Sequence, residues 1–285
     1  MRIDVCAIVL KLNAQFAAGL PLPAYCANPS ASFNATGTFQ TMTIPVTGNY
    51  LIEAAGAQGG ADSLTYAHAG GLGARVSGIV PLAAGDVLCI IVGMRPAGPA
   101  GPYDAGGGGG GSFVFRSDAG CTAKPALPLI VAGGGGGGAG SGGEVTVNGG
   151  NGAGLGGVNG AGGSAYISGL SEYHSGGGGA GWSSLGQGGS PATFAGGGGH
   201  WAGGAGASYL NTLSSPGGFG GGGGAGMVCE AGCGSGGGGG FSGGGGGART
   251  TDLHAGGGGS YISGTSPVST TAVQAGHGYV AITLQ

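Results

Sequence analysis

The sequence predicts an all-β protein: an antiparallel β-sandwich or jelly-roll with an inserted bundle of polyglycine-II helices and essentially no α-helix. Three observations lead to this prediction. The chain of 285 residues contains 82 glycines, many of them in uninterrupted runs. Only 6% of the residues are charged, whereas disordered chains are usually rich in charge. The apolar segments are short, and most of them alternate apolar with polar residues, which is typical of strands.

The strands can be placed in order along the chain. They are expected at residues 1–12, 39–44, 50–55, 74–80, 87–92, 113–115, 127–131 and 276–284. Residues 87–92 form a continuous apolar run, which predicts a central buried strand. Glu53 alternates with Tyr50 and Ile52 and should face outward. Residues 13–37 are rich in proline and alanine and read as a connecting arm with turn signals.

Glycine runs of four or more dominate the second half of the chain. There are eight, at 106–111, 133–138, 176–179, 196–199, 220–224, 236–240, 243–247 and 256–259. A polyglycine helix of the polyproline-II type has about three residues per turn and no internal hydrogen bonds, so its amides and carbonyls must pair with neighbours. Backbones approach this closely only where no Cβ intervenes. Pure glycine runs punctuated by bulky apolar residues therefore favour a packed bundle over a flexible linker.

These elements divide the chain into three parts. Residues 1–37 form an N-terminal strand and its connecting arm. Residues 38–132 together with 261–285 form the β-sandwich, because the last strand must rejoin the first half. Residues 133–260 form the glycine bundle, to which 105–111 contribute.

The six cysteines point to disulfides and to an extracellular or cell-surface location. Cys229 and Cys233 are expected to form a local disulfide, and chain order suggests Cys6–Cys26 and Cys89–Cys121 as further pairings. Asn34 begins the sequon Asn-Ala-Thr and is a candidate glycosylation site in a secreted protein. The first residues make a poor signal peptide, so they are expected to belong to the folded protein.

No catalytic, metal-binding or cofactor-binding residues are expected. The histidines have no metal-ligand spacing, and His277 is expected to satisfy a backbone group; all five are His68, His174, His200, His254 and His277. No nucleophile elbow occurs, and no glycine run is followed by the lysine of a phosphate loop. The net charge of −3 makes nucleic acid a poor partner. No apolar run approaches the roughly 18 residues of a membrane-spanning helix.

Aromatic residues within the glycine-rich half have two interpretations. They can cap the bundle and fill its seam with the sandwich, or they can form an exposed patch that binds a glycan or a protein receptor. The residues concerned are Tyr173, Trp182, Phe194, Trp201, Tyr209, Phe219, Phe241 and Tyr261.

Several motifs, in a fixed order, carry a resemblance over residues 38–285. They are YLIEAAGAQGG (50–60), LAAGDVLCIIVG (82–93), AGGGGGGSFVF (105–115), LPLIVAGGGGGG (127–138), GGFGGGGG (217–224) and GHGYVAI (276–282). The chain resembles the glycine-rich extracellular domain of the anaplastic lymphoma kinase and leukocyte tyrosine kinase receptors, and equally bacterial and phage glycine-rich surface proteins and adhesins. The resemblance implies a jelly-roll fused to a polyglycine-II bundle and says little about function.

The preferred function is a non-enzymatic, self-assembling filament subunit. Its residues 1–12, with Ile3, Val5, Ala7 and Val9 on one face, would add as a donated strand to the next subunit. The alternatives are an adhesin or receptor-binding tip module and a secreted ligand-binding ectodomain. Ice binding is disfavoured because it needs a flat face of small residues, and the bulky aromatics interrupt such a face.

Overall fold

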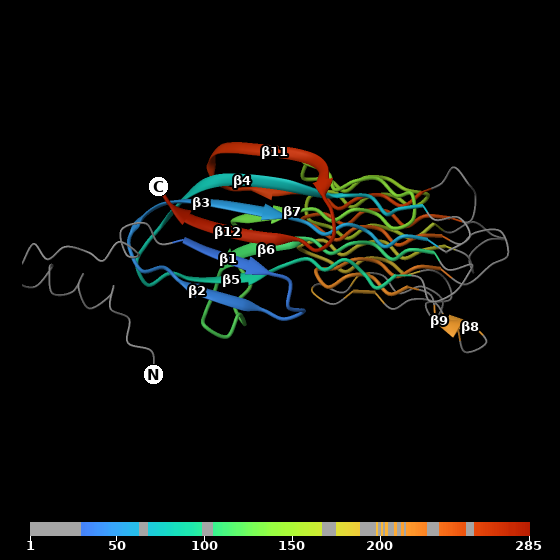
Figure 1. Ribbon diagram of the computed structural model, residues 1–285, viewed down its shortest axis with the longest axis horizontal. Helices are drawn as coiled ribbons and strands as arrows, with labels where there is room; N and C mark the ends of the chain where they lie inside the picture. Colours follow the sequence, from blue (N-terminus) through green and yellow to red (C-terminus); the bar gives the residue numbers. More distant parts are fainter. Residues whose placement is uncertain are drawn as a thin grey trace, which may run out of the picture.

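The computed structural model describes residues 30–62, 68–98, 105–166, 175–188, 198, 201, 203–204, 208–209, 212–213, 215–226, 234–248 and 254–285. In this part of the chain there is no helix, and ten of the strands form two antiparallel five-stranded sheets. The sheets lie at one end of the long axis and the glycine segments at the other (Figure 1). The predicted all-β class is therefore confirmed, while the jelly-roll topology stays a prediction.

The first sheet has the strand order β1-β12-β3-β4-β11. Its members are β1 (Ser30–Asn34), β12 (Tyr279–Leu284), β3 (Gly48–Ala55), β4 (Gly73–Leu82) and β11 (Thr265–Gln274). The closing strand β12 pairs with β3 along its whole length, from Tyr279 opposite Ala55 to Leu284 opposite Tyr50. The end of the chain thus rejoins the first half, as the sequence predicts.

The second sheet has the strand order β10-β7-β6-β5-β2. Its members are β10 (Tyr261–Ile262), β7 (Ile130–Ala132), β6 (Ser112–Arg116), β5 (Val87–Ile91) and β2 (Gln40–Thr43). A separate pair of two-residue strands, β8 (Ser208–Tyr209) and β9 (Thr212–Leu213), lies in the glycine-rich half.

The core of the sandwich forms where the alternating apolar residues of the two sheets meet. Tyr50, Ile52 and Ala54 of β3 are fully buried there, while Glu53 between them is on the outer face, as the alternation predicts. Strand β5 differs because both of its faces are covered: Leu88 and Ile90 face the core, and Cys89 and Ile91 face a second apolar cluster. This double burial explains its continuous apolar sequence.

Five of the strands were not predicted: the two-residue strands β8, β9 and β10, and the two edge strands of the first sheet, β1 and β11. β1 lies within the segment that reads as connecting arm, yet it pairs with β12 from Ser30 opposite Thr283 to Asn34 opposite Tyr279. β11 is exposed over almost its whole length, so it has no apolar period to reveal it. The domain boundary near residue 38 is accordingly wrong for residues 30–34, which belong to the first sheet.

The amides of one glycine run point to three neighbours in turn. Along 133–138, Gly134 and Gly137 donate to the segment at 236–239, Gly135 and Gly138 donate to the segment at 57–60, and Gly136 donates to Ser141, with N···O distances of 2.8–2.9 Å. In two of the three directions, the amide three residues further on therefore returns to the same neighbour; in the third, Gly133 donates to Ser260 Oγ and Gly136 to Ser141. This pattern agrees with a helix of about three residues per turn, which polyglycine II would form.

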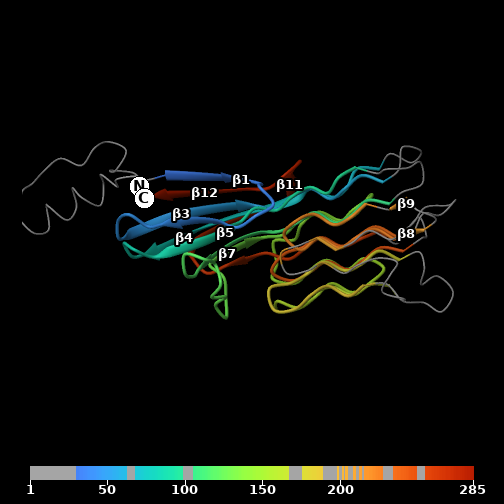
Figure 2. The same cartoon turned by 90° about the horizontal axis from the view of Figure 1, so that it is seen from below.

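The run at 236–240 lies at the centre of the bundle. Its amides donate to the segments at 106–109, 177–180 and 256–259, and its carbonyls accept from the segments at 134–137, 223 and 244. Six segments thus surround one run, and the extended glycine segments lie side by side in Figure 2. The hydrogen bonds that polyglycine II cannot make within itself are satisfied between segments.

The bundle grows directly out of the sandwich. β3, β5 and β7 run on into 56–60, 92–98 and 133–138, and β4, β6 and β10 begin where 68–72, 105–111 and 254–260 end. Gly56 donates to Ala74 and Gly278 donates to Gly93, both at 2.9 Å, so the strand ladders and the glycine lattice are connected. The sandwich therefore fixes the spacing at which the innermost glycine segments start.

Candidate functional site

Aromatic side chains gather on the face of the second sheet that points away from the core. Phe113 and Phe115 of β6 pack against Trp182 and Trp201, with ring centroids 5.2–6.2 Å apart. Trp182 is only 3% exposed, and Phe241 stacks on Tyr261 at 4.6 Å. We call this group the aromatic seam. The position of the aromatic seam agrees with the interpretation in which the aromatic residues fill the junction of bundle and sandwich.

Lys124 covers the aromatic seam with its ammonium group. Its Nζ lies 4.6 Å from the Trp182 ring centroid and 5.7 Å from that of Trp201, and it donates a hydrogen bond to the Trp182 carbonyl oxygen. Burial lowers the pKa of Lys124 from its ordinary value. A partly desolvated cation over an aromatic face makes a stabilising cation–π contact, so Lys124 lies against the outer edge of the seam.

A disulfide anchors the loop that carries Lys124. Cys89 in β5 is bonded to Cys121, with a Cα–Cα distance of 5.7 Å, which is one of the pairings suggested by chain order. Asp118 stabilises the same loop, because its carboxylate accepts hydrogen bonds from both the amide and the hydroxyl of Thr122. The loop is thereby tied to the sheet beside the aromatic seam.

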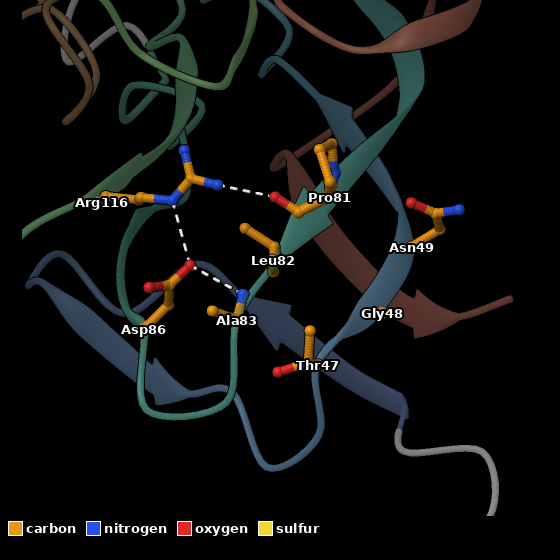
Figure 3. A pocket seen from close by; sticks show the side chains of 8 residues that line it. All are labelled: Thr47, Gly48, Asn49, Pro81, Leu82, Ala83, Asp86 and Arg116. Atoms are coloured by element: carbon orange, nitrogen blue, oxygen red, sulfur yellow. Dashed lines mark hydrogen bonds and ion pairs between the residues drawn. The ribbon is translucent and has the colours of Figure 1, made fainter.

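An open hollow of about 530 Å³ lies at the end of the sandwich away from the bundle (Figure 3). Its polar groups bind one another. Arg116 Nε lies 3.1 Å from Asp86 Oδ2, Arg116 Nη2 donates to the Pro81 carbonyl at 2.7 Å, and Asp86 accepts from the Ala83 amide at 3.0 Å. This arrangement holds the β4–β5 turn and presents no nucleophile beside a base.

The remaining ion pairs also hold parts of the fold together. Asp62 accepts hydrogen bonds from both the amide and the ring of His68. Glu53, on the outer face of the first sheet, accepts from Tyr279 Oη at 2.6 Å and lies 3.5 Å from Arg75 Nε. Within the described ranges, no group of three or more histidine, cysteine, aspartate or glutamate residues could hold a metal ion.

The structure places only some of the residues singled out from the sequence. Cys6, Cys26, Cys229 and Cys233 lie outside the described residues, as do the donor-strand residues Ile3, Val5, Ala7 and Val9. Asn34 is exposed at the end of β1. His277 accepts a hydrogen bond from the Arg95 amide at 3.1 Å, which confirms that it satisfies a backbone group. Lys124 had no sequence signal, because its partners are 58 and more residues away.

Comparison with known proteins adds no family to this description. No protein-family model matches the chain, and no curated protein matches its sequence. The part of the chain that the structure describes also holds no helix that could span a membrane.

Proposed function

We propose that this chain is a non-enzymatic, extracellular structural subunit that assembles into filaments by donating residues 1–12 to the next subunit. One observation carries the proposal. Among the described residues, strands from residue 30 onward already build two five-stranded sheets, and a further strand-like segment with alternating Ile3, Val5, Ala7 and Val9 precedes them in the sequence. A strand in excess of the subunit's own sheets is what head-to-tail strand donation requires.

The start of β1 supports an arm that leads away from the subunit. Ser30 pairs with Thr283 near the C-terminus, at the end of the sandwich opposite the bundle (Figure 1). A donor and an acceptor at different places on one subunit make a heterologous contact, which repeats into an open filament. The rigid glycine bundle would then project from each subunit.

The Cys89–Cys121 disulfide supports the extracellular location. Disulfides persist in oxidising compartments and are rare in reducing ones. The low content of lysine and arginine, 7 in 285 residues, gives no reason to expect nucleic acid as a partner.

Deletion of residues 1–12 tests the proposal. We expect the parent protein to form fibres in negative-stain electron microscopy and the truncated protein to remain a folded monomer by light scattering and circular dichroism. Val5→Asn should shorten the fibres, because it places an amide on the apolar face of the strand. Asp4→Asn, which adds the same side chain to the opposite face, is the matched control. Fibres of unchanged length after truncation would end the proposal.

A second candidate function is an adhesin or receptor-binding module. The observation that favours it is an apolar surface on the bundle, which we call the bundle flank. It consists of Val147, Leu155, Val158 and Leu185, which are 41–69% exposed. Their segments adjoin: Gly149 donates to Gly157 at 2.9 Å, Leu155 to Ser164 Oγ at 2.8 Å, and Gly162 to Ser184 Oγ at 2.9 Å. Clustered exposed aliphatic side chains are typical of binding surfaces.

A printed glycan array tests this second candidate. If the bundle flank binds a glycan, the double variant Leu155→Ser/Leu185→Ser should lose the signal of the parent. Val268→Ser, at an equally exposed valine on the sandwich, should keep it. The absence of any signal from the parent protein would count against glycan binding.

A further inference from the structure

The two lateral sides of the sandwich differ in the edge strands that form them. One side is formed by the edge strands β1 and β2, which follow each other in the chain and are joined by the hydrogen bond of Gln40 Nε2 to the Asn34 carbonyl at 2.9 Å. The other side is formed by β11 and the short β10. Figure 1 shows β1 and β2 on one side of the sheets and β11 on the other.

The β1–β2 side leaves part of the core uncovered. Phe33 and Met42 pack against the core cluster from β1 and β2 but are only partly buried, and the same is true of Ala35 and Leu284 nearby. By contrast, the members of the same cluster on the inner strands are buried, for example Ile52 and Ile282 at 0% exposure.

The opposite side has the features that natural proteins use to prevent strand addition. β11 contains Pro267, which lacks an amide proton, and its pairing with β4 is interrupted by two irregularities. Ser266 and Ala272, at these irregularities, have φ of 50°. Proline and bulges at an edge strand block further pairing. Of the two lateral edges of this sheet, β1 is therefore the one suited to accept a strand.

We infer that the β1–β2 side is the acceptor for residues 1–12 of a second copy of this chain, an inference that rests on the proposed function. A strand whose side chains alternate between its two faces would match both surfaces at this side: the partly covered apolar core and the exposed polar outer face. Ile3, Val5 and the residues in step with them would cover Phe33 and Met42. Arg2, Asp4 and Cys6 would lie on the outer face, in line with Ser30, Ser32 and Asn34 of β1, which are exposed there.

The length of the arm permits this contact. Residues 13–29 can extend to about 56 Å at about 3.3 Å per residue. The edge strands of a five-stranded sheet lie only about 19 Å apart at about 4.8 Å per strand. An arm of this length is longer than the sheet is wide, so it could extend beyond its own subunit to the β1 edge of a neighbour.

Disulfide trapping tests the inference. In the otherwise full-length chain, Cys26→Ala leaves Cys6 without its expected partner, and a new cysteine is added at one outer-face position of β1 by Ser30→Cys, Ser32→Cys or Asn34→Cys. Residues directly opposite on adjacent strands are close enough to form a disulfide. After oxidation, at least one variant should give a ladder of covalent oligomers on a non-reducing gel, with Cys6 identified as the linked residue by peptide mapping.

Two control variants and the possible outcomes distinguish a failure of this inference from a failure of the proposed function. Val268→Cys on β11 should give no ladder, and Cys6→Ala should abolish the ladder of the β1 variants. Filaments without a ladder from any β1 position, or with a ladder from Val268→Cys alone, would overturn the inference but leave filament formation standing. A disulfide within single monomers would show that the strand covers its own sandwich. Parent protein that stays monomeric would refute both proposals.

Discussion

The backbone of Gly135 lies against that of Gly71, and a Cβ at Gly135 would overlap the Gly71 carbonyl oxygen. The same holds along the runs: a Cβ at Gly237 would overlap the Gly244 carbonyl, and one at Gly258 the Gly239 carbonyl. The obstacle at these positions is another segment's backbone, which cannot move aside as a side chain can. Glycine is required here by contact between segments and not by an unusual backbone angle.

We predict that Gly135→Val destabilises the protein by about 3 kcal/mol or more, because an overpacked side chain meets fixed backbone. The matched control is Gly98→Val, since a Cβ at Gly98 has nothing within 4 Å. This control should change the free energy of unfolding by no more than about 0.5 kcal/mol. Urea denaturation followed by circular dichroism measures both values. Equal midpoints for the two variants would contradict the packed lattice.

A single residue, Tyr279, also makes the stability of the folded protein depend on pH. Burial, together with the hydrogen bond to Glu53, raises the pKa of Tyr279 to about 12. A raised pKa in the folded state means that the folded protein holds the proton more tightly than the unfolded chain does. The resulting stability is present below the ordinary pKa of about 10 and is lost as the pH rises toward 12.

Tyr279→Phe should therefore weaken the fall of the melting temperature between about pH 10 and pH 12. Tyr50, whose pKa is also raised by burial, remains in both proteins and contributes equally to both curves. Melting scans by circular dichroism at closely spaced pH values give the comparison. Parallel curves for parent and variant in this range would show that Tyr279 does not titrate as described.

At the scale of elements, the sequence predicts strands that have one apolar face or a continuous apolar run, and it misses the others. β3 and β4 are predicted because apolar and polar residues alternate along them, and β5 is predicted because both of its faces are buried. β1 and β11 are missed, since neither has a long apolar face and β11 contains a proline. The glycine runs are predicted because their purity has only one good physical explanation. Lys124 over the aromatic seam could not be predicted, because the contact depends on the tertiary fold.

The loop closed by the Cys89–Cys121 disulfide gives a prediction for this scale. The bonded residues are 32 positions apart, and replacing both with alanine should lower the free energy of unfolding by about 2–4 kcal/mol. The segment between β6 and β7, which Cys121 no longer anchors, should then release Lys124, so the tryptophan emission maximum should move to longer wavelength as water reaches Trp182. Lys124→Met in the disulfide-bonded protein is the control, because it removes the charge and keeps the apolar stem. An unchanged spectrum in the double alanine variant would show that the disulfide does not hold the seam closed.

At the scale of the molecule, the described part of the chain is one network of hydrogen bonds in which strands and glycine segments continue into each other. Within the described part of the chain, inner runs such as 133–138 and 236–240 pair with segments far away in sequence, including 57–60, 106–109 and 256–259. No inner run can therefore separate without breaking bonds to several others. The bundle and the sandwich are expected to unfold together.

Amide hydrogen exchange measures this cooperativity. The amides of residues 134–138 and 236–240 should exchange as slowly as those of β3 and β12, because all of them open only with global unfolding. Glycine amides in a flexible linker would exchange within seconds under the same conditions. Fast exchange in the runs beside slow exchange in β3 would divide the molecule into two independent units.

The amides of a glycine run point in three directions that repeat every three residues. This repeat also limits how the length of a glycine run can change. One glycine inserted after Gly135 would turn every later residue of that run by about 120°. Gly137 and Gly138, which now reach Gly236 and Gly60, would then point toward the wrong segments. Only whole turns of three residues would restore the direction, and each would slide the rest of the run by about 9 Å. Insertions and deletions inside the inner runs should accordingly be far less tolerated than equal changes in the loops that join them.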